Sequence, residues 1–260
     1  MKTTLKYALL LAGMISLPAM AHVSYTNRDL GTYTGLTTAT STISNQAVTG
    51  NFGWADAADN NLGDSHKARA FRFTLQNEAW VTFSAAANPT ATGASIGGLL
   101  PGFSIYQGLA AIAPLPTGQT SPDYDFNPAS VAWRTAWAEA NLDAGKTFAD
   151  TDGSWNAVGN WKMGGDGDVA GVDSQLSSFI YVGSASSNTN SVSGMFKLAA
   201  GNYSIFVGGN DIANKADPIN SLKAYGLTTT LSVSAVPEPE TYALLLAGLG
   251  VLGAVARRRI

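Results

Sequence analysis

The sequence predicts an all-β fold: a single β-sandwich of jelly-roll type with one inserted helix. Three observations lead to this prediction. Several short segments alternate apolar and polar residues, which is the period of a half-buried strand. Glycine, asparagine, proline and serine separate these segments at short intervals. A single stretch between residues 22 and 235 has helical character.

The first half of the body contributes the clearest strands. Residues 32–49 are rich in threonine and serine and predict one or two strands. Residues 69–75 alternate apolar and polar side chains, residues 76–78 form a turn, and residues 80–85 continue as a second strand. We therefore expect a β-hairpin over residues 69–86, with Trp80 in the core.

The later strands are shorter and rich in aromatic or β-branched residues. Such residues pack well on a pleated surface and are enriched in strands. Five segments fit this description: residues 103–106, 178–182, 194–198, 203–207 and 228–233. The last of these is the β-branched part of residues 222–233, which we expect to form the final strand.

One helix interrupts the series of strands. Asn127 is a good N-cap, and Pro128 occupies the first helical position, where its missing N–H costs nothing. Residues 129–142 carry apolar side chains at helical spacing, and Gly145 follows. We expect this helix to cover one end of the sandwich.

The N-terminus has the pattern of a signal peptide. Lys2 and Lys6 form a basic region, residues 7–17 are apolar, and residues 18–21 supply an A-x-A cleavage site. This predicts a signal peptide over residues 1–21, an ectodomain over 22–235 and a mature chain that starts at His22.

The C-terminus reads as a short membrane anchor. Residues 242–256 are uncharged and apolar, and three arginines, Arg257, Arg258 and Arg259, follow them. This run is shorter than the ~20 residues of a comfortable membrane span, but it can cross a locally thinned bilayer. The arginines place that end in the cytoplasm. We expect a transmembrane helix within residues 236–260.

The same tail resembles the PEP-CTERM sorting signal of Gram-negative bacteria. That signal consists of a Pro-Glu-Pro motif, a hydrophobic helix and an arginine-rich end, which correspond here to Pro237, Glu238 and Pro239, the apolar run, and the three arginines. The resemblance implies processing by an exosortase at the inner membrane. It also implies delivery to the surface or extracellular matrix of a host that makes exopolysaccharide.

Composition narrows the partners. The chain has no cysteine, so disulfides and thiol chemistry are excluded. Charged residues make up 13% of the chain, with a net charge of −3 and no basic stripe, which disfavours nucleic acid. A neutral polar surface suits a protein among extracellular polysaccharides.

Acidic residues gather in a glycine-rich part of the body and suggest a structural calcium site. Calcium takes six to eight oxygen ligands from such loops. The candidate ligands are Asp150, Asp152, Asp166, Asp168 and Asp173. An Asp/Gly pair is also ordinary turn chemistry, so a bare acidic loop is the alternative.

Two tryptophans beside this acidic segment are candidates for stacking on sugar rings. Trp155 and Trp161 flank a Gly/Asn loop, and we expect both to be exposed; Tyr124 and Trp54 are weaker candidates. Buried packing is the alternative role for a tryptophan. Residues 71–75, 102–106 and 198–207 also loosely resemble strands of bacterial pre-peptidase C-terminal and carbohydrate-binding sandwiches.

The two histidines raise a copper alternative. Cleavage after Ala21 would give His22 both an α-amine and an imidazole, and His66 would complete a three-nitrogen histidine brace, which suits copper. The sequence thus favours a non-enzymatic exported protein with a structural or adhesive role in an exopolysaccharide-rich envelope. A carbohydrate-binding module and a copper protein are the alternatives.

Overall fold

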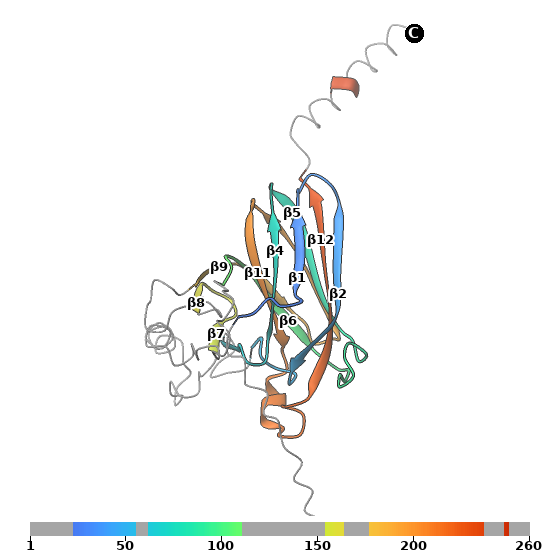
Figure 1. Cartoon of the computed structure of the whole chain (residues 1–260), viewed down its shortest axis with the longest axis vertical. Coiled ribbons are helices and arrows are strands. Elements are labelled where there is room, and N and C mark those ends of the chain that lie inside the picture. Colours follow the sequence, from blue (N-terminus) through green and yellow to red (C-terminus); the bar gives the residue numbers. More distant parts are fainter. Residues whose placement is uncertain (1–22, 56–61, 111–153, 164–176, 237–246, 250–260) are drawn as a thin grey trace, which may run out of the picture.

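The described residues form two β-sheets that pack face to face (Figure 1). The computed structural model describes residues 23–55, 62–110, 154–163, 177–236 and 247–249. Their regular secondary structure is almost entirely strand, with a short 3₁₀ helix, η4 (Ile212–Ala216). The all-β prediction is confirmed. The predicted signal peptide and inserted helix lie outside the described residues.

The larger sheet has six strands. In spatial order they are β1 (Asp29–Tyr33), β4 (Arg69–Leu75), β11 (Gly201–Gly209), β6 (Pro101–Gln107), β9 (Ser177–Ser186) and β8 (Trp161–Met163). The β1–β4 pair is parallel and the other pairs are antiparallel.

The smaller sheet has four antiparallel strands. In spatial order they are β10 (Ser191–Leu198), β5 (Ala79–Ala87), β12 (Ala224–Ala235) and β2 (Ala39–Thr49). Two short strands, β3 (Leu62–Asp64) and β7 (Ser154–Asn156), pair apart from both sheets. Six strands facing four, with a parallel pair, differ from the eight-stranded arrangement of a jelly roll.

The predicted hairpin over residues 69–86 is wrong. β4 belongs to the six-stranded sheet and β5 to the four-stranded sheet, so residues 76–78 carry the chain from one sheet to the other. The alternation itself was read correctly. Phe73 on β4 and Phe83 on β5 are both buried in the core between the sheets, rather than paired within one sheet.

One hydrophobic core fills the space between the sheets. Phe83 of the smaller sheet meets Phe103 of the larger one edge to face, with ring centroids 4.8 Å apart. Phe73 stacks on Tyr203 at 5.0 Å within the larger sheet. The core also takes Leu227, Leu231 and Val233 from β12. Burial of these side chains supplies the main driving force for joining the sheets.

A second cluster covers part of the opposite face of the six-stranded sheet. It includes Tyr106 from β6, Phe206 from β11 and Phe179 from β9, packed with Trp54 and Trp155 from outside the sheet. Both β6 and β11 are consequently buried on both faces over most of their length. The four-stranded sheet has no such cover among the described residues.

The last strand leads directly into the C-terminal tail. β12 lies between β5 and β2 and ends at Ala235, at the end of the sandwich opposite η4 (Figure 1). Residues 247–249 are helical, but among the described residues no helix is long and apolar enough to cross a membrane. The transmembrane helix predicted from the sequence falls largely on residues outside those described.

Candidate functional site

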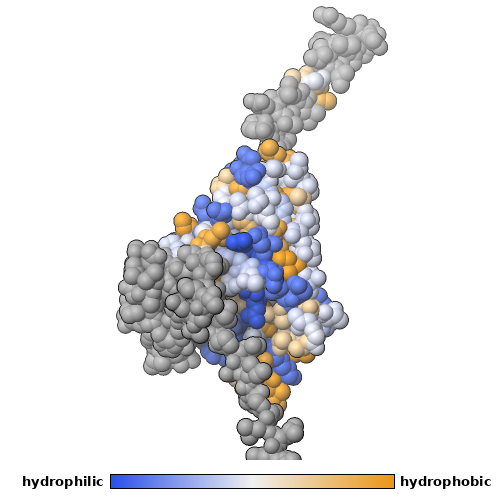
Figure 2. All heavy atoms as spheres, in the orientation of Figure 1, coloured by the Kyte–Doolittle hydropathy of each residue, from blue (hydrophilic) through white to orange (hydrophobic). Residues whose placement is uncertain are grey.

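The outer face of the four-stranded sheet is covered with hydroxyl groups. Along β5 from Ala79 to Ala85 and along β12 from Leu227 to Ser234 the burial alternates, so every second side chain there points away from the core. We call the following outward-facing residues of the four strands the hydroxyl face: Thr40, Thr42, Thr82, Ser84, Ser191, Ser193, Thr228, Thr230, Ser232 and Ser234. In Figure 2 the flank where β2 lies is pale, the colour of near-neutral hydropathy.

The strand register aligns these hydroxyls in rows across the sheet. One row runs from Ser193 through Ser84 and Thr230 to Thr42, and its neighbour runs from Thr82 through Ser232 to Thr40. The hydroxyls of Thr40 and Ser232 lie 3.0 Å apart, and those of Thr42 and Thr230 lie 3.1 Å apart. Each hydroxyl can donate once and accept twice, so these contacts leave capacity for a ligand.

An aromatic and a thioether side chain border the hydroxyl face at one end. Trp80 is partly exposed on β5, and the exposed Met195 stands on β10, where it pairs with Thr82. Lys197, the partner of Trp80 in the register, forms an ion pair of 2.9 Å with Glu78. The prediction that Trp80 lies in the core is wrong, because its position in the β5 alternation turns it outward.

Trp155 and Trp161 differ from their prediction in the opposite direction to Trp80. Both were expected to be exposed, and both are buried, with 1% and 3% of their surface accessible. Trp155 stacks on Phe206 with ring centroids 5.0 Å apart and meets the edge of Tyr106 at 6.0 Å. The expectation of exposure is wrong because these rings cover the second face of the six-stranded sheet. No face of Trp155 or Trp161 is presented to a sugar.

Trp54 is also part of this cover. Its ring lies over Gly102 on β6, and its backbone lies over Gly208, the partner of Gly102 on β11. A Cβ atom at Gly102 would lie 2.5 Å from the Trp54 ring. The indole Nε1 donates a hydrogen bond of 2.8 Å to the Ser104 hydroxyl. Trp54 is 7% exposed, so its weaker candidacy for sugar stacking has no support either.

Buried hydroxyl groups tie the cover to the sheet. The Tyr25 and Ser204 hydroxyls are 2.5 Å apart, and Ser204 donates to the Gly108 carbonyl. Tyr106 donates to the backbone carbonyl of Asn156, next to Trp155. Burial raises the pKa of Tyr106 well above its usual value and also raises the pKa of Tyr25. Both tyrosines are therefore neutral hydrogen-bond partners at physiological pH.

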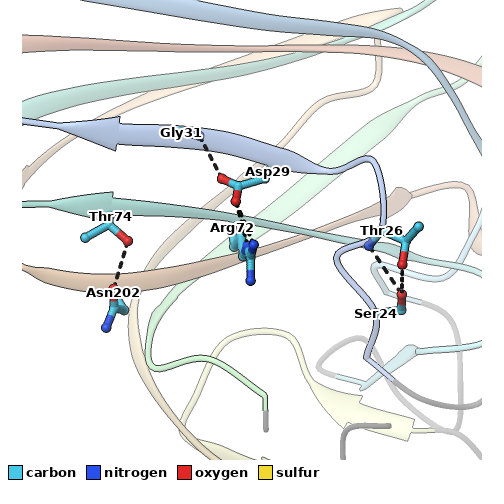
Figure 3. A network of polar contacts seen from close by, with 7 residues as sticks. All are labelled: Ser24, Thr26, Asp29, Gly31, Arg72, Thr74 and Asn202. Carbon is cyan, nitrogen blue, oxygen red and sulfur yellow. Dashed lines mark hydrogen bonds and ion pairs between the residues drawn. The ribbon is translucent and has the colours of Figure 1, made fainter. Parts of the chain in front are cut away.

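Beyond this cover, the outer face of the six-stranded sheet is charged and polar (Figure 3). Arg72 forms an ion pair of 2.8 Å with Asp29, both of them about half exposed. The guanidinium also lies over the Tyr25 ring at 5.8 Å. Thr74 donates to the Asn202 side chain at 2.8 Å. These contacts join β1, β4 and β11 and satisfy one another, which is typical of a solvated sheet surface.

The candidate calcium ligands Asp150, Asp152, Asp166, Asp168 and Asp173 lie outside the described residues. Their neighbours in sequence are anchored, because β7 and β8 carry the buried Trp155 and Trp161. Within the described ranges, no group of three His, Cys, Asp or Glu residues could hold a metal ion. Calcium binding by these aspartates stays a prediction.

His66 lies in the turn after β3. Its backbone N–H donates to the Asp64 carboxylate at 2.8 Å, and its Nδ1 lies 3.0 Å from the same oxygen. His22 is outside the described residues, but the next residue, Val23, is buried in the second cluster together with Trp155. β7, which carries Trp155, pairs with β3. The copper brace therefore also stays a prediction.

The tail identifies the class of protein. Residues 235–259 match the family model of the PEP-CTERM protein-sorting motif, which confirms the resemblance seen in the sequence. The chain is an exported protein that an exosortase sorts at the membrane, through an anchored intermediate, to the cell surface.

Comparisons of the whole chain give only weak structural likenesses. No curated protein matches the sequence. The solved structures that match include CorA of Methylomicrobium album BG8, a surface-associated copper-binding protein important in copper acquisition. The likeness to CorA has 12% sequence identity and a TM-score of 0.41, and it covers 83% of this chain and 99% of CorA. They also include MopE, a secreted protein of Methylococcus capsulatus in which an oxidized tryptophan facilitates copper binding. The likeness to MopE has 15% sequence identity and a TM-score of 0.35, and it covers 80% of this chain and 87% of MopE.

Proposed function

We propose that this protein is a non-enzymatic structural or adhesive component of an exopolysaccharide-rich cell envelope. The observation that carries the proposal is the junction between body and tail. β12 is an inner strand of the four-stranded sheet and ends at Ala235, where the sorting motif begins. The sheet that bears the hydroxyl face is thus joined to the sorting tail without a linker.

This junction suits a load-bearing role. β12 is hydrogen-bonded to β5 along one edge and to β2 along the other, over nearly its whole length. While the tail is anchored, a pull on it acts along a strand held on both sides, and many backbone hydrogen bonds share the load. The core residues Leu227, Leu231 and Val233 further hold the strand between its neighbours.

Cell fractionation combined with a cohesion assay tests the proposal. In the native host we expect wild-type protein at the surface or in the matrix, and a strain lacking it to form a matrix that disperses more easily under shear. Replacing Pro237, Glu238 and Pro239 together with alanine should stop sorting and reproduce the loss of cohesion. Thr241→Ala is the matched control next to the motif. Normal cohesion without the protein would contradict the structural role.

The copper protein remains a second candidate, and the packing of Val23 favours it. Val23 and Trp155 share the second cluster, and β7, which carries Trp155, pairs with β3, which ends at Asp64 two residues before His66. Isothermal titration with Cu²⁺ on the processed protein tests this candidate. Loss of binding in His66→Ala, but not in Ser65→Ala, is expected; an N-terminus other than His22 would exclude the brace.

A further inference from the structure

We propose that the hydroxyl face is a docking surface for an extended, uncharged polysaccharide chain, with Trp80 stacking on a sugar ring at one end. This inference rests on the proposed function and names its partner. It concerns the outer surface of β10, β5, β12 and β2, whose outward side chains are partly or fully exposed; at one end Asn88 donates a hydrogen bond of 2.9 Å to Thr228. Three properties of this surface support it: its regular spacing, its lack of charge and its aromatic border.

The spacing follows from the sheet itself. Neighbouring strands lie about 4.8 Å apart, and side chains on the same face of a strand repeat at about 6.8 Å. The register places threonine or serine at successive points of this grid, as in the row Ser193, Ser84, Thr230 and Thr42. The result is a broad array of groups that each donate and accept hydrogen bonds. A chain of sugars presents the complementary array of hydroxyls.

The charge pattern of the hydroxyl face favours an uncharged polymer over a charged one. Of the outward positions on the four strands, only Lys197 is charged, and Glu78 neutralises it at 2.9 Å. An acidic polysaccharide or a nucleic acid would find no unbalanced cation on the hydroxyl face. A charged ligand would also lose hydration without an ionic partner in return. An uncharged, hydroxyl-rich polymer meets no such penalty.

The aromatic border gives the contact its anchor. Trp80 is the one tryptophan among the described residues that is not buried, and Met195 extends the apolar edge on the neighbouring strand. A partly exposed indole offers a rigid apolar surface at low entropic cost, and the C–H groups on one face of a sugar ring can pack against it. Sugar hydroxyls at the ring edge then remain free for the threonine and serine rows.

A second copy of the chain fits this surface less well. The centre of a stable protein interface is apolar and enriched in aromatic residues. Here the centre is Thr82, Ser84, Thr230 and Ser232, and the apolar side chains stand at the border. The array therefore favours a hydrated polar polymer.

Affinity gel electrophoresis of the full chain in detergent tests the docking surface. The probes are a neutral, extended glucomannan and, as the charged counterpart, alginate. We expect glucomannan to retard the wild type and alginate to have no effect. Trp80→Ala should weaken glucomannan binding about tenfold, the equivalent of ~1.4 kcal/mol. The double variant Thr82→Val, Thr230→Val should weaken it as well, without a change in shape or charge.

Matched controls lie on the six-stranded sheet. Ile180→Ala removes an exposed apolar side chain from β9, and Thr74→Val removes an outward hydroxyl from β4; neither should change binding. Circular dichroism checks that each variant is folded. Full retardation of Trp80→Ala, or stronger retardation by alginate than by glucomannan, would overturn the proposal.

Sedimentation velocity tests the alternative that a second copy of the chain, rather than a polysaccharide, binds the hydroxyl face. If the wild type is an oligomer and Trp80→Ala is a monomer, the hydroxyl face is an interface between copies and the polysaccharide proposal fails. The fractionation and cohesion experiments do not depend on Trp80. If they succeed while the binding experiment fails, the envelope role stands and only the docking surface is wrong.

Discussion

The outer faces of the two sheets of this sandwich differ in how far other side chains cover them. The six-stranded sheet is covered on part of its outer face by Trp54 and Trp155, which pack on Phe206 and Tyr106. The four-stranded sheet leaves its outer face open and lines it with threonine and serine. The covered face contributes to stability and the open face is available for a partner. Burial, rather than residue type, decides which tryptophan can bind.

The apolar–polar pattern of the strands differs between the two sheets in the same way. In β5 and β12 most inward side chains are apolar and most outward ones are threonine or serine, as in strands exposed on one face, with Trp80 and Ala86 as outward exceptions and Thr229 as an inward one. β6 and β11 place aromatic residues such as Tyr106 and Phe206 out of step with their core-facing neighbours. Such broken alternation marks strands buried on both faces. It was the available indication that something in the chain had to cover the larger sheet.

The largest expected effect compares one tryptophan from each face. Trp155→Ala should lower the free energy of unfolding by ~3–5 kcal/mol, because it empties a fully buried site. Trp80→Ala should lower it by no more than about 1 kcal/mol, since Trp80 is partly exposed. Chemical denaturation of both variants measures the difference. Equal losses would mean that the two faces are not distinct in the way described.

The glycines under Trp54 give the next effect. Gly102→Ala places a methyl group 2.5 Å from the indole ring, so Trp54 has to shift and part of the cover loosens. We expect a loss of ~1–3 kcal/mol, typical of overpacking. Gly93→Ala is the matched control, because a Cβ there meets no atom within 4 Å. A shift in melting temperature of Gly102→Ala no larger than that of the control would argue against tight contact.

Alkaline pH should weaken the covered face. The folded-state pKa values of Tyr106 and Tyr25 are raised by burial, so their contribution to stability is complete below the ordinary tyrosine pKa of 10.0. It is lost as pH rises above that value, by up to about 1.4 kcal/mol per pH unit for each tyrosine. Denaturation between about pH 8 and about pH 11 measures this loss. In Tyr106→Phe it should be smaller; the same slope in both proteins would refute the assignment.

The smallest effect distinguishes the two faces of a single strand. Thr229 on β12 is fully buried in the core, and its hydroxyl has no hydrogen-bond partner among the described residues. Thr229→Val should therefore be neutral or stabilise by less than about 1 kcal/mol. Thr230→Val, one residue along, removes the contact with Thr42 and should cost a few tenths of a kcal/mol. The reverse order of melting temperatures would show that Thr229 has a partner.

Much of the fold was predictable from local patterns, and the candidate site was not. Most strands of the described residues follow from alternation and turn chemistry. The hairpin failed because residues 76–78 pass between sheets, and a local pattern cannot say whether consecutive strands pair or face each other. The tryptophans were assigned the wrong way round, since exposure depends on which segment covers which sheet.

The sequence by itself determined the destination of this protein. The Pro-Glu-Pro motif, the apolar run and the terminal arginines are contiguous in the sequence, so the sorting motif is identified without knowledge of the fold. Only the tertiary structure decided which surface is open. The threonines and serines of β2, β5, β10 and β12 are far apart in the chain, and only the strand register aligns them into one uncharged array.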